Sequence, residues 1–360
     1  MKIFEKAKAR IEKRAEKKSD TDVITQKNIE ESRDEILAKG KKFKYPFQYA
    51  KHRLIFYTIL IGVVAIGTFA LVGWHQLYRA QSTSEVIYRF TRALNLSVAE
   101  VDGVKVRFSD YLMLYRSSIT SMERQQGAFD NSEESKLQKE YYKRQALNSA
   151  EDYSYAMARL AETGKDVTDA EIDEIIDGHK TIDGEKRSSE AFEGIVRENF
   201  GLSMKEYRRL IMLSLAEKKA SVEFDADARA LADEIQTKLT ADKDFGKIMQ
   251  DYAENDAVSY ELVEGVETSN LDNGRAEMAA SLANVGDVSG YFVSRSGDGY
   301  YFVKLTARDE KYLSYESIWV RFKWLDDQMA TLRAEGKVSE KIDLKADDVN
   351  AEKVEELATN

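Results

Sequence analysis

The sequence of 360 residues has no cysteine, one proline and three histidines, and these shortages exclude several kinds of chemistry. Without cysteine there is no disulfide bond, thiolate zinc site or cysteine nucleophile. The histidines are His52, His75 and His179, and we expect His179 to face solvent because no second ligand or base accompanies it. The GxSxG, HExxH, P-loop and GxGxxG motifs are also missing. We therefore predict no metal site and no cofactor.

Charge is distributed unevenly along the chain. Residues 1–53 contain 16 Lys and Arg against 9 Asp and Glu, whereas residues 79–360 contain 38 against 55. Residues 54–78 between them contain none of the four. Binding to a phosphate backbone depends on Lys and Arg. The acidic main part therefore argues against a nucleic-acid partner.

The uncharged segment predicts a membrane helix. Its first 21 residues, 54–74, would rise about 32 Å as a helix, which matches the hydrocarbon core of a bilayer. The excess of Lys and Arg before Leu54 places the N-terminus in the cytoplasm under the positive-inside rule. We predict a cytoplasmic basic tail (1–53), an uncleaved single-pass signal anchor in the cell membrane (54–78) and an extracytoplasmic main part. A buried core helix and a cleaved signal peptide are the alternatives.

Residues 97–222 have the pattern of a mostly helical module. Asp102-Gly103, flanked by valines, predicts a short hairpin, and Ser109 predicts the start of a helix. An apolar stripe predicts a long helix over about 134–162, ended by Gly164. Capping boxes at Thr168–Glu171 and Ser203–Glu206 predict two further helix starts.

The order of these motifs resembles a known family. "VxxVDGxxVxxxDY", a long helix, "VTDAEIDEII" and "FGLSMKEYRRLI" together look like the N-terminal domain of the SurA/PrsA/PpiD group of extracytoplasmic folding factors. The resemblance implies a cradle of helices and a short strand pair that holds unfolded polypeptide. An unrelated helical bundle is the alternative.

Residues 223–310 predict a small α/β domain. Two helices are expected, over 225–240 and 242–257, followed by a short helix within 274–290. Tyr-, Phe- and Val-rich strands around Ser296–Gly299 then predict a hairpin over 290–305.

This second stretch resembles a parvulin-type prolyl isomerase domain. The resemblance rests on Asp244-Phe245, the segment Tyr252–Asp256, the turn Gly286–Ser289 and the hairpin strand 299–305. Parvulins open with a strand ending in histidine, but residues 220–224 occupy that place here without one.

The hairpin histidine of the parvulins is replaced by Tyr301 in this chain. Because the resemblance attributes catalysis to the histidine pair, we predict no catalytic residue. Met278, Phe292, Tyr301 and Phe302 are the candidates for an apolar peptide-binding groove. Strand alternation requires at least half of them to fill the core instead.

Residues 311–348 predict a strand, a helix with Trp324 and Leu332, and a last short strand around 342–344. By resemblance this segment completes the helical domain, so that the parvulin-like domain is an insertion; residues 349–360 form an acidic tail. The predicted fold class is α+β: a single N-terminal transmembrane helix, then a mostly helical chaperone-like module carrying the inserted domain.

Three functions fit these patterns. The first is a membrane-anchored extracytoplasmic chaperone that binds unfolded or translocating polypeptides without covalent chemistry. The second is an active peptidyl-prolyl cis/trans isomerase on the same scaffold, against which the missing histidines count. The third is a non-enzymatic scaffold of the secretion or cell-envelope machinery. A deep apolar trough between residues 97–222 and 313–344 would favour a chaperone, and a sealed core there would favour a scaffold.

Overall fold

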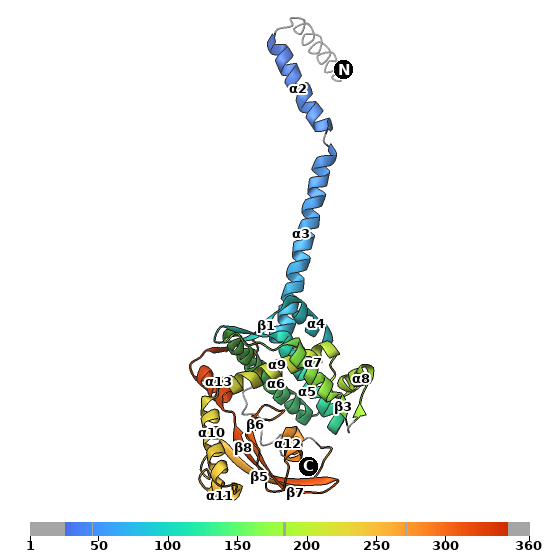
Figure 1. Cartoon of the computed structure of the whole chain (residues 1–360). Coiled ribbons are helices and arrows are strands. Elements are labelled where there is room, and N and C mark those ends of the chain that lie inside the picture. Colours follow the sequence, from blue (N-terminus) through green and yellow to red (C-terminus); the bar gives the residue numbers. More distant parts are fainter. Residues whose placement is uncertain (1–25, 45, 183–184, 271, 345–360) are drawn as a thin grey trace, which may run out of the picture. The chain divides into compact units, whose positions relative to one another are not determined.

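The computed structural model describes residues 26–44, 46–182, 185–270 and 272–344 (Figure 1). The chain divides into two compact units, Met1–Gly73 and Trp74–Asn360. Residues 1–25 of the predicted basic tail and the predicted acidic tail 349–360 lie outside the described residues.

The N-terminal unit consists of the helices α2 (Gln26–Lys44) and α3 (Pro46–Trp74), and the π-helical turn η1 (His75–Arg79) follows in the chain. The helical stretch His52–Arg79 is long and apolar enough to cross a membrane, and it is the only such stretch within the described residues. None of its apolar window is buried, and the side chain of Ile66 is 72% exposed. The alternative of a buried core helix is therefore wrong for the described structure.

The second unit begins with a mostly helical module that has one hydrophobic core. Its elements are α4 (Glu85–Leu94), β1 (Ser97–Val101), β2 (Val104–Arg107), α5 (Phe108–Gln126), α6 (Glu133–Glu162), α7 (Asp169–His179), β3 (Thr181–Ile182), β4 (Glu185–Lys186), α8 (Ser189–Phe200) and α9 (Met204–Phe224).

Local sequence signals determine where these helices begin and end. Both predicted capping boxes are present: the Thr168 and Ser203 hydroxyls accept hydrogen bonds from backbone N–H groups three residues on, and the carboxylates of Glu171 and Glu206 accept in return. Gly164, with φ of 72°, follows the predicted long helix, which is α6.

The predicted helix start at Ser109 is wrong. Helix α5 begins at Phe108, whose N–H donates to the Leu96 carbonyl oxygen at 2.8 Å. The chain therefore turns from β2 directly into the helix. Ser109 is buried in its first turn instead of capping it.

The end of the chain returns to the helical module. Strand β9 (Val338–Glu340) pairs antiparallel with β1, which gives a three-stranded sheet in the order β2-β1-β9. Helix α13 (Trp324–Ala334) buries Leu325, Met329 and Leu332 in the same core as the helices before it. The predicted return of a helix is found in α13, but the returning strand is Val338–Glu340 and not the predicted stretch around 342–344, which is described without a strand.

A second module lies in the chain between α9 and α13. Its elements are α10 (Ala226–Ala241), α11 (Phe245–Gln250), β5 (Val258–Glu267), the 3-10 turn η2 (Asp272–Gly274), α12 (Arg275–Ser281), β6 (Phe292–Val293), β7 (Gly299–Arg308) and β8 (Tyr312–Arg321).

The strands of this module form a four-stranded antiparallel sheet in the order β5-β8-β7-β6 (Figure 1). Helices α10 and α11 cover one face, where Ile235 and Phe245 pack against Phe302 and Ile318. Helix α12 covers the other face, where its alanines pack against Val303, Leu305 and Tyr315. The chain as a whole is α+β, as predicted.

Three boundaries differ from the prediction. Strand β8 was assigned to the helical domain with the rest of 311–348, but it pairs with β7 and β5 and so lies inside the second sheet. Residues 220–224, where the parvulin resemblance has an opening strand, are the last residues of α9. The helix predicted over 242–257 is limited to α11. Secondary structure in these places follows pairings far along the chain, which short patterns do not encode.

Candidate functional site

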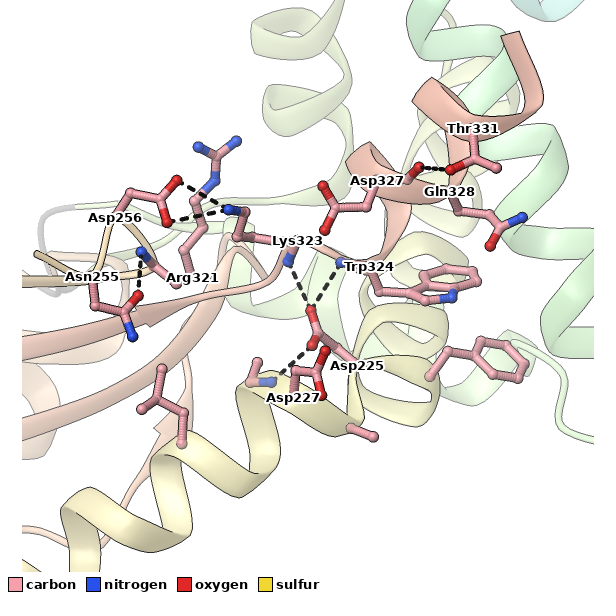
Figure 2. Close-up of a pocket in the computed structure, with 15 residues that line it drawn as sticks. Asp225, Asp227, Asn255, Asp256, Arg321, Lys323, Trp324, Asp327, Gln328 and Thr331 are labelled. Carbon is pink, nitrogen blue, oxygen red and sulfur yellow. Dashed lines mark hydrogen bonds and ion pairs between the residues drawn. The ribbon is translucent and has the colours of Figure 1, made fainter. Parts of the chain in front are cut away.

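The chain passes between the two modules twice, at residues 224–226 and 322–324, and one carboxylate binds both crossings (Figure 2). Asp225 caps α10 by accepting from the Ala228 N–H at 2.9 Å. Its other oxygen accepts from the backbone N–H groups of Lys323 at 2.7 Å and Trp324 at 3.0 Å. The side chain is only 5% exposed.

In this arrangement, which we call the Asp225 clasp, one carboxylate accepts hydrogen bonds from the N-terminal ends of two helices, α10 and α13. Within the described residues, Lys323 at the N-cap position of α13 makes no side-chain capping hydrogen bond of its own. Asp225 therefore supplies the cap of α13 from a distant part of the sequence. A negative charge at two helix N-termini is favoured by both helix dipoles.

A pocket of about 500 Å³ lies beside the Asp225 clasp. Its lining is largely charged, with Asp227, Asp327 and the ion pair between Lys323 and Asp256 at 3.0 Å (Figure 2). Phe224 and Trp324 form its aromatic part. The lining therefore combines charged and polar groups with apolar side chains.

The surface between the helical module and α13 is closed. The Trp324 ring lies 4.8 Å from the ring of Phe224 and stacks on Tyr155 at 6.4 Å between centroids. Met329 and Leu332 of α13 are each 2% exposed. The deep apolar trough that we considered at this place is therefore filled by α13 itself.

A different hollow, of about 380 Å³, lies on the helical module, and we call it the helical groove. It is formed by α5, α6, α9 and the end of α8, and its walls combine partly exposed apolar side chains with hydroxyl and amide groups. The lining residues are Leu114, Ser117, Ser118, Ser121, Met122, Tyr142, Gln145, Ala146, Ser149, Tyr153, Phe200 and Leu210. Apolar walls with a few polar groups are typical of sites that bind peptide side chains.

The four residues predicted to form a peptide groove do not lie together. Met278 on α12 and Phe292 on β6 pack against the core beneath α12, and the Phe292 ring lies 6.2 Å from the ring of Tyr301. Phe302 points to the opposite face, where it is fully buried. Three of the four therefore share one face of the sheet, and Phe302 fills the core of the other, as strand alternation requires.

Tyr301 has an aromatic partner that the sequence patterns did not indicate. Trp319 of β8 stands directly opposite Tyr301 in the sheet, and the two rings stack at 5.9 Å with an interplanar angle of 12°. The signal that could have revealed Trp319 is the alternation of apolar residues over 313–321. A turn precedes this alternating stretch, and the Asp309 carboxylate stabilises it by accepting from the backbone N–H groups of Lys311 and Tyr312.

The polar atoms of both rings are already engaged. The Tyr301 hydroxyl donates to the Asp298 carboxylate at 3.0 Å, and the Trp319 Nε1–H donates to the Asp298 carbonyl oxygen at 3.3 Å. Burial, and then the neighbouring Asp298, raise the pKa of Tyr301. The phenol therefore stays protonated and bound to its own turn, with no free donor directed at a bound peptide.

Buried carboxylates lie where α6, α9 and α13 meet. Burial first, and then the negative charges of Asp152 and Asp326, raise the pKa of Glu217 on α9 to about 7. Burial also raises the pKa of Asp152 on α6 to about 6. Next to Asp152, the fully buried Glu151 accepts from Arg333 of α13 at 2.9 Å. The packing of α13 therefore depends on groups that titrate near neutral pH.

No group of three His, Asp or Glu side chains is placed to hold a metal ion in the described part of the chain. His179 is exposed, as predicted, and its Nδ1 lies 2.9 Å from the Tyr207 hydroxyl.

The helical module thus combines a hollow of about 380 Å³ with one returning strand, and it carries an inserted sheet domain. Residues 47–221 match the family model of the SurA-like N-terminal domain, which covers α3 to α9 and ends before the second module. The match supports a SurA/PrsA-like fold for this part and suggests a chaperone-type folding factor. No curated protein and no solved structure matches the chain significantly.

Proposed function

We propose that the protein is a membrane-anchored extracytoplasmic chaperone that holds non-native segments of translocated polypeptides in the helical groove. The observation that carries the proposal is the groove within residues 47–221, the part that matches the SurA-like domain. SurA-like domains bind unfolded polypeptides, and burial of exposed apolar side chains is the force that such binding uses.

The same proposal places the chain in the cell membrane through residues 54–74, with the second unit outside the cytoplasm. The exposed apolar surface of the helical stretch His52–Arg79 supports a membrane span, and the basic flank before it supports the orientation. Protease added to wall-stripped cells should then remove the second unit. Full protection of residues 79–360 would contradict the orientation.

We further propose that the second module is a parvulin-like domain without isomerase activity. Rotation about a prolyl bond has a barrier of roughly 18–20 kcal/mol, which is lowered only by groups that favour the twisted amide. The module has no histidine, and both Tyr301 and Trp319 use their donors on Asp298. Its aromatic face can contact a peptide, but neither ring has a donor free to stabilise the twist.

Two assays on the full chain in nanodiscs test these proposals. The protein should suppress aggregation of an unfolded reference protein, while isomerisation of a short proline peptide stays near its uncatalysed rate. Gln145→Leu with Ser149→Leu, which fill the helical groove, should reduce suppression, and the control Asp227→Ala should not. A large acceleration of isomerisation that Tyr301→Phe abolishes would contradict the non-catalytic assignment.

A scaffold of the secretion or cell-envelope machinery is the second candidate, and one observation favours it. Helix α13 closes the surface of the helical module on which it packs, as expected of a part that serves assembly instead of client release. Crosslinking in cells separates the two candidates. Many transient adducts at the helical groove would support the chaperone, and one stable adduct would support the scaffold.

A further inference from the structure

Strand β5 is an edge strand of the second module, since the sheet order is β5-β8-β7-β6. It is ten residues long, and most of its side chains are exposed. An edge strand presents a row of unpaired backbone N–H and C=O groups to any extended chain that approaches it. Which residues carry those groups follows from the pairing of β5 with β8.

The outward-facing backbone groups of β5 that the regular ladder leaves unpaired belong to Tyr260 and Leu262, because the Val258 N–H, which also faces outward, donates to the Asn255 carbonyl oxygen at 3.1 Å. The Arg321 N–H donates to the Ala257 carbonyl oxygen at 2.8 Å, so residue 257 faces β8. Hydrogen-bonded and non-bonded pairs alternate in an antiparallel ladder. Residues 259, 261 and 263 therefore also bond to β8, while Tyr260 and Leu262 direct their backbone groups away from it. A bulge between Val263 and Val266, with Gly265 at φ of 65°, ends the regular edge.

The side chains of this edge combine apolar surface with negative charge. Tyr260 and Leu262 are 41% and 50% exposed on the same face of the sheet. Glu261, Glu264 and Glu267 are exposed as well, and β5 itself has no Lys or Arg. Glu261 pairs with Arg275 of α12 at 2.6 Å and Glu267 lies 3.8 Å from the Lys311 ammonium, so Glu264 carries most of the unopposed charge. A strand added to this edge would therefore meet apolar side chains on one face and carboxylates along its length.

We propose that β5 is a second client-binding surface, which pairs by strand addition with an extended polypeptide of alternating apolar and basic residues. The proposal rests on the proposed chaperone function and names the class of client segment. A second copy of the chain is disfavoured as the occupant, because β5 pairing with β5 would bring the glutamates of two strands together. A basic strand supplies both the missing backbone partners and the opposite charge.

The test uses the full chain in nanodiscs and two fluorescent ten-residue peptides, one alternating Val with Lys and the other Val with Glu. The Lys peptide should bind about tenfold more tightly, because each opposite-charge pair across strands adds a small favourable increment. Hydrogen exchange of residues 258–264 should slow when the Lys peptide is added. Equal affinity for both peptides would overturn the proposal.

Substitutions at Leu262 separate backbone pairing from side-chain contact. Leu262→Pro removes an outward N–H that β8 does not use, whereas Leu262→Thr keeps it, so only the proline variant should lose binding, by about fivefold or more. The double change Glu261→Lys and Glu264→Lys should reverse the peptide preference, while Glu190→Lys on α8 should leave it unchanged. These charge variants keep the test valid if the proline variant does not fold.

The location of protection distinguishes the remaining outcomes. If the Lys peptide slows hydrogen exchange in the helical groove and not at residues 258–264, the edge proposal is overturned, whereas the proposed chaperone function is still supported. If hydrogen exchange at residues 258–264 slows without peptide as the protein concentration rises, the occupant of the edge is a second copy of the chain, which would also overturn the edge proposal. Binding at 258–264 without suppression of aggregation would support the edge and refute the chaperone function.

Discussion

Replacing Asp225 by alanine should loosen both crossings between the modules at once. The change removes the acceptor of three backbone N–H groups, those of Ala228, Lys323 and Trp324. A lost N-cap costs about 1 kcal/mol, and a buried donor left without a partner costs about 1–3 kcal/mol. Because the adjoining pocket of about 500 Å³ can admit water to some of these groups, we expect a total near the lower end, about 3 kcal/mol.

Hydrogen exchange measures this loss where it occurs. About 3 kcal/mol of local destabilisation corresponds to exchange roughly 100-fold faster in the first turns of α10 and α13. Asp227→Ala is the matched control, since Asp227 lines the same pocket and is exposed, and its effect should stay within about 0.5 kcal/mol (Figure 2). Unchanged exchange at α13 in Asp225→Ala would refute the reasoning that one carboxylate caps both helices.

Three further changes test other parts of the structure. Glu217 has a folded pKa raised to about 7 from an ordinary 4.5, so the folded state binds more protons between these values. Its contribution to stability should fall by about 1.4 kcal/mol from pH 6 to pH 8 in denaturant titrations; Glu217→Gln should remove this share and leave that of Glu151 and Asp152, whose pKa values are also raised. Phe302→Ala should cost about 3–5 kcal/mol of unfolding free energy and Phe292→Ala clearly less; equal losses would contradict the assignment of the two faces. Gly299→Ala should cost about 3 kcal/mol or more and shift tryptophan fluorescence, because a Cβ there would lie 2.3 Å from Trp319 Nε1; a wild-type spectrum and stability would count against the packing.

The helical module could be predicted closely because its signals are local. The capping boxes at Thr168 and Ser203 act over three residues, and the turn at Asp102-Gly103 needs two positive φ angles, 47° and 84°, which these residue types accept. Each signal is complete within one turn of chain. These helix starts and this turn therefore form without tertiary contacts, and the sequence alone predicts them.

The second sheet was predicted less well because strand partners are chosen at long range. Residues 312–321 have the same alternating pattern whichever sheet they join, and the pairing with both β7 and β5 decides the outcome. The same limit applies to the candidate site. Tyr301 was identified by its place in a motif, but its stacking partner Trp319 is fixed only by the register between β7 and β8.

The position of β8 in the second sheet explains how the second module can be inserted into the sequence of the helical module without disrupting its fold. Because β8 ends at Arg321 and α10 begins at Ala226, the module enters and leaves the chain at neighbouring points, both bound by Asp225. An inserted domain with adjacent ends adds little constraint to its host. A second contact then fixes its orientation: the Lys218 ammonium on α9 donates to the Ser294 carbonyl oxygen at 2.6 Å. The Lys218 contact and the Asp225 clasp, which join the modules at two separate points, together restrict rotation of the second module about the crossings.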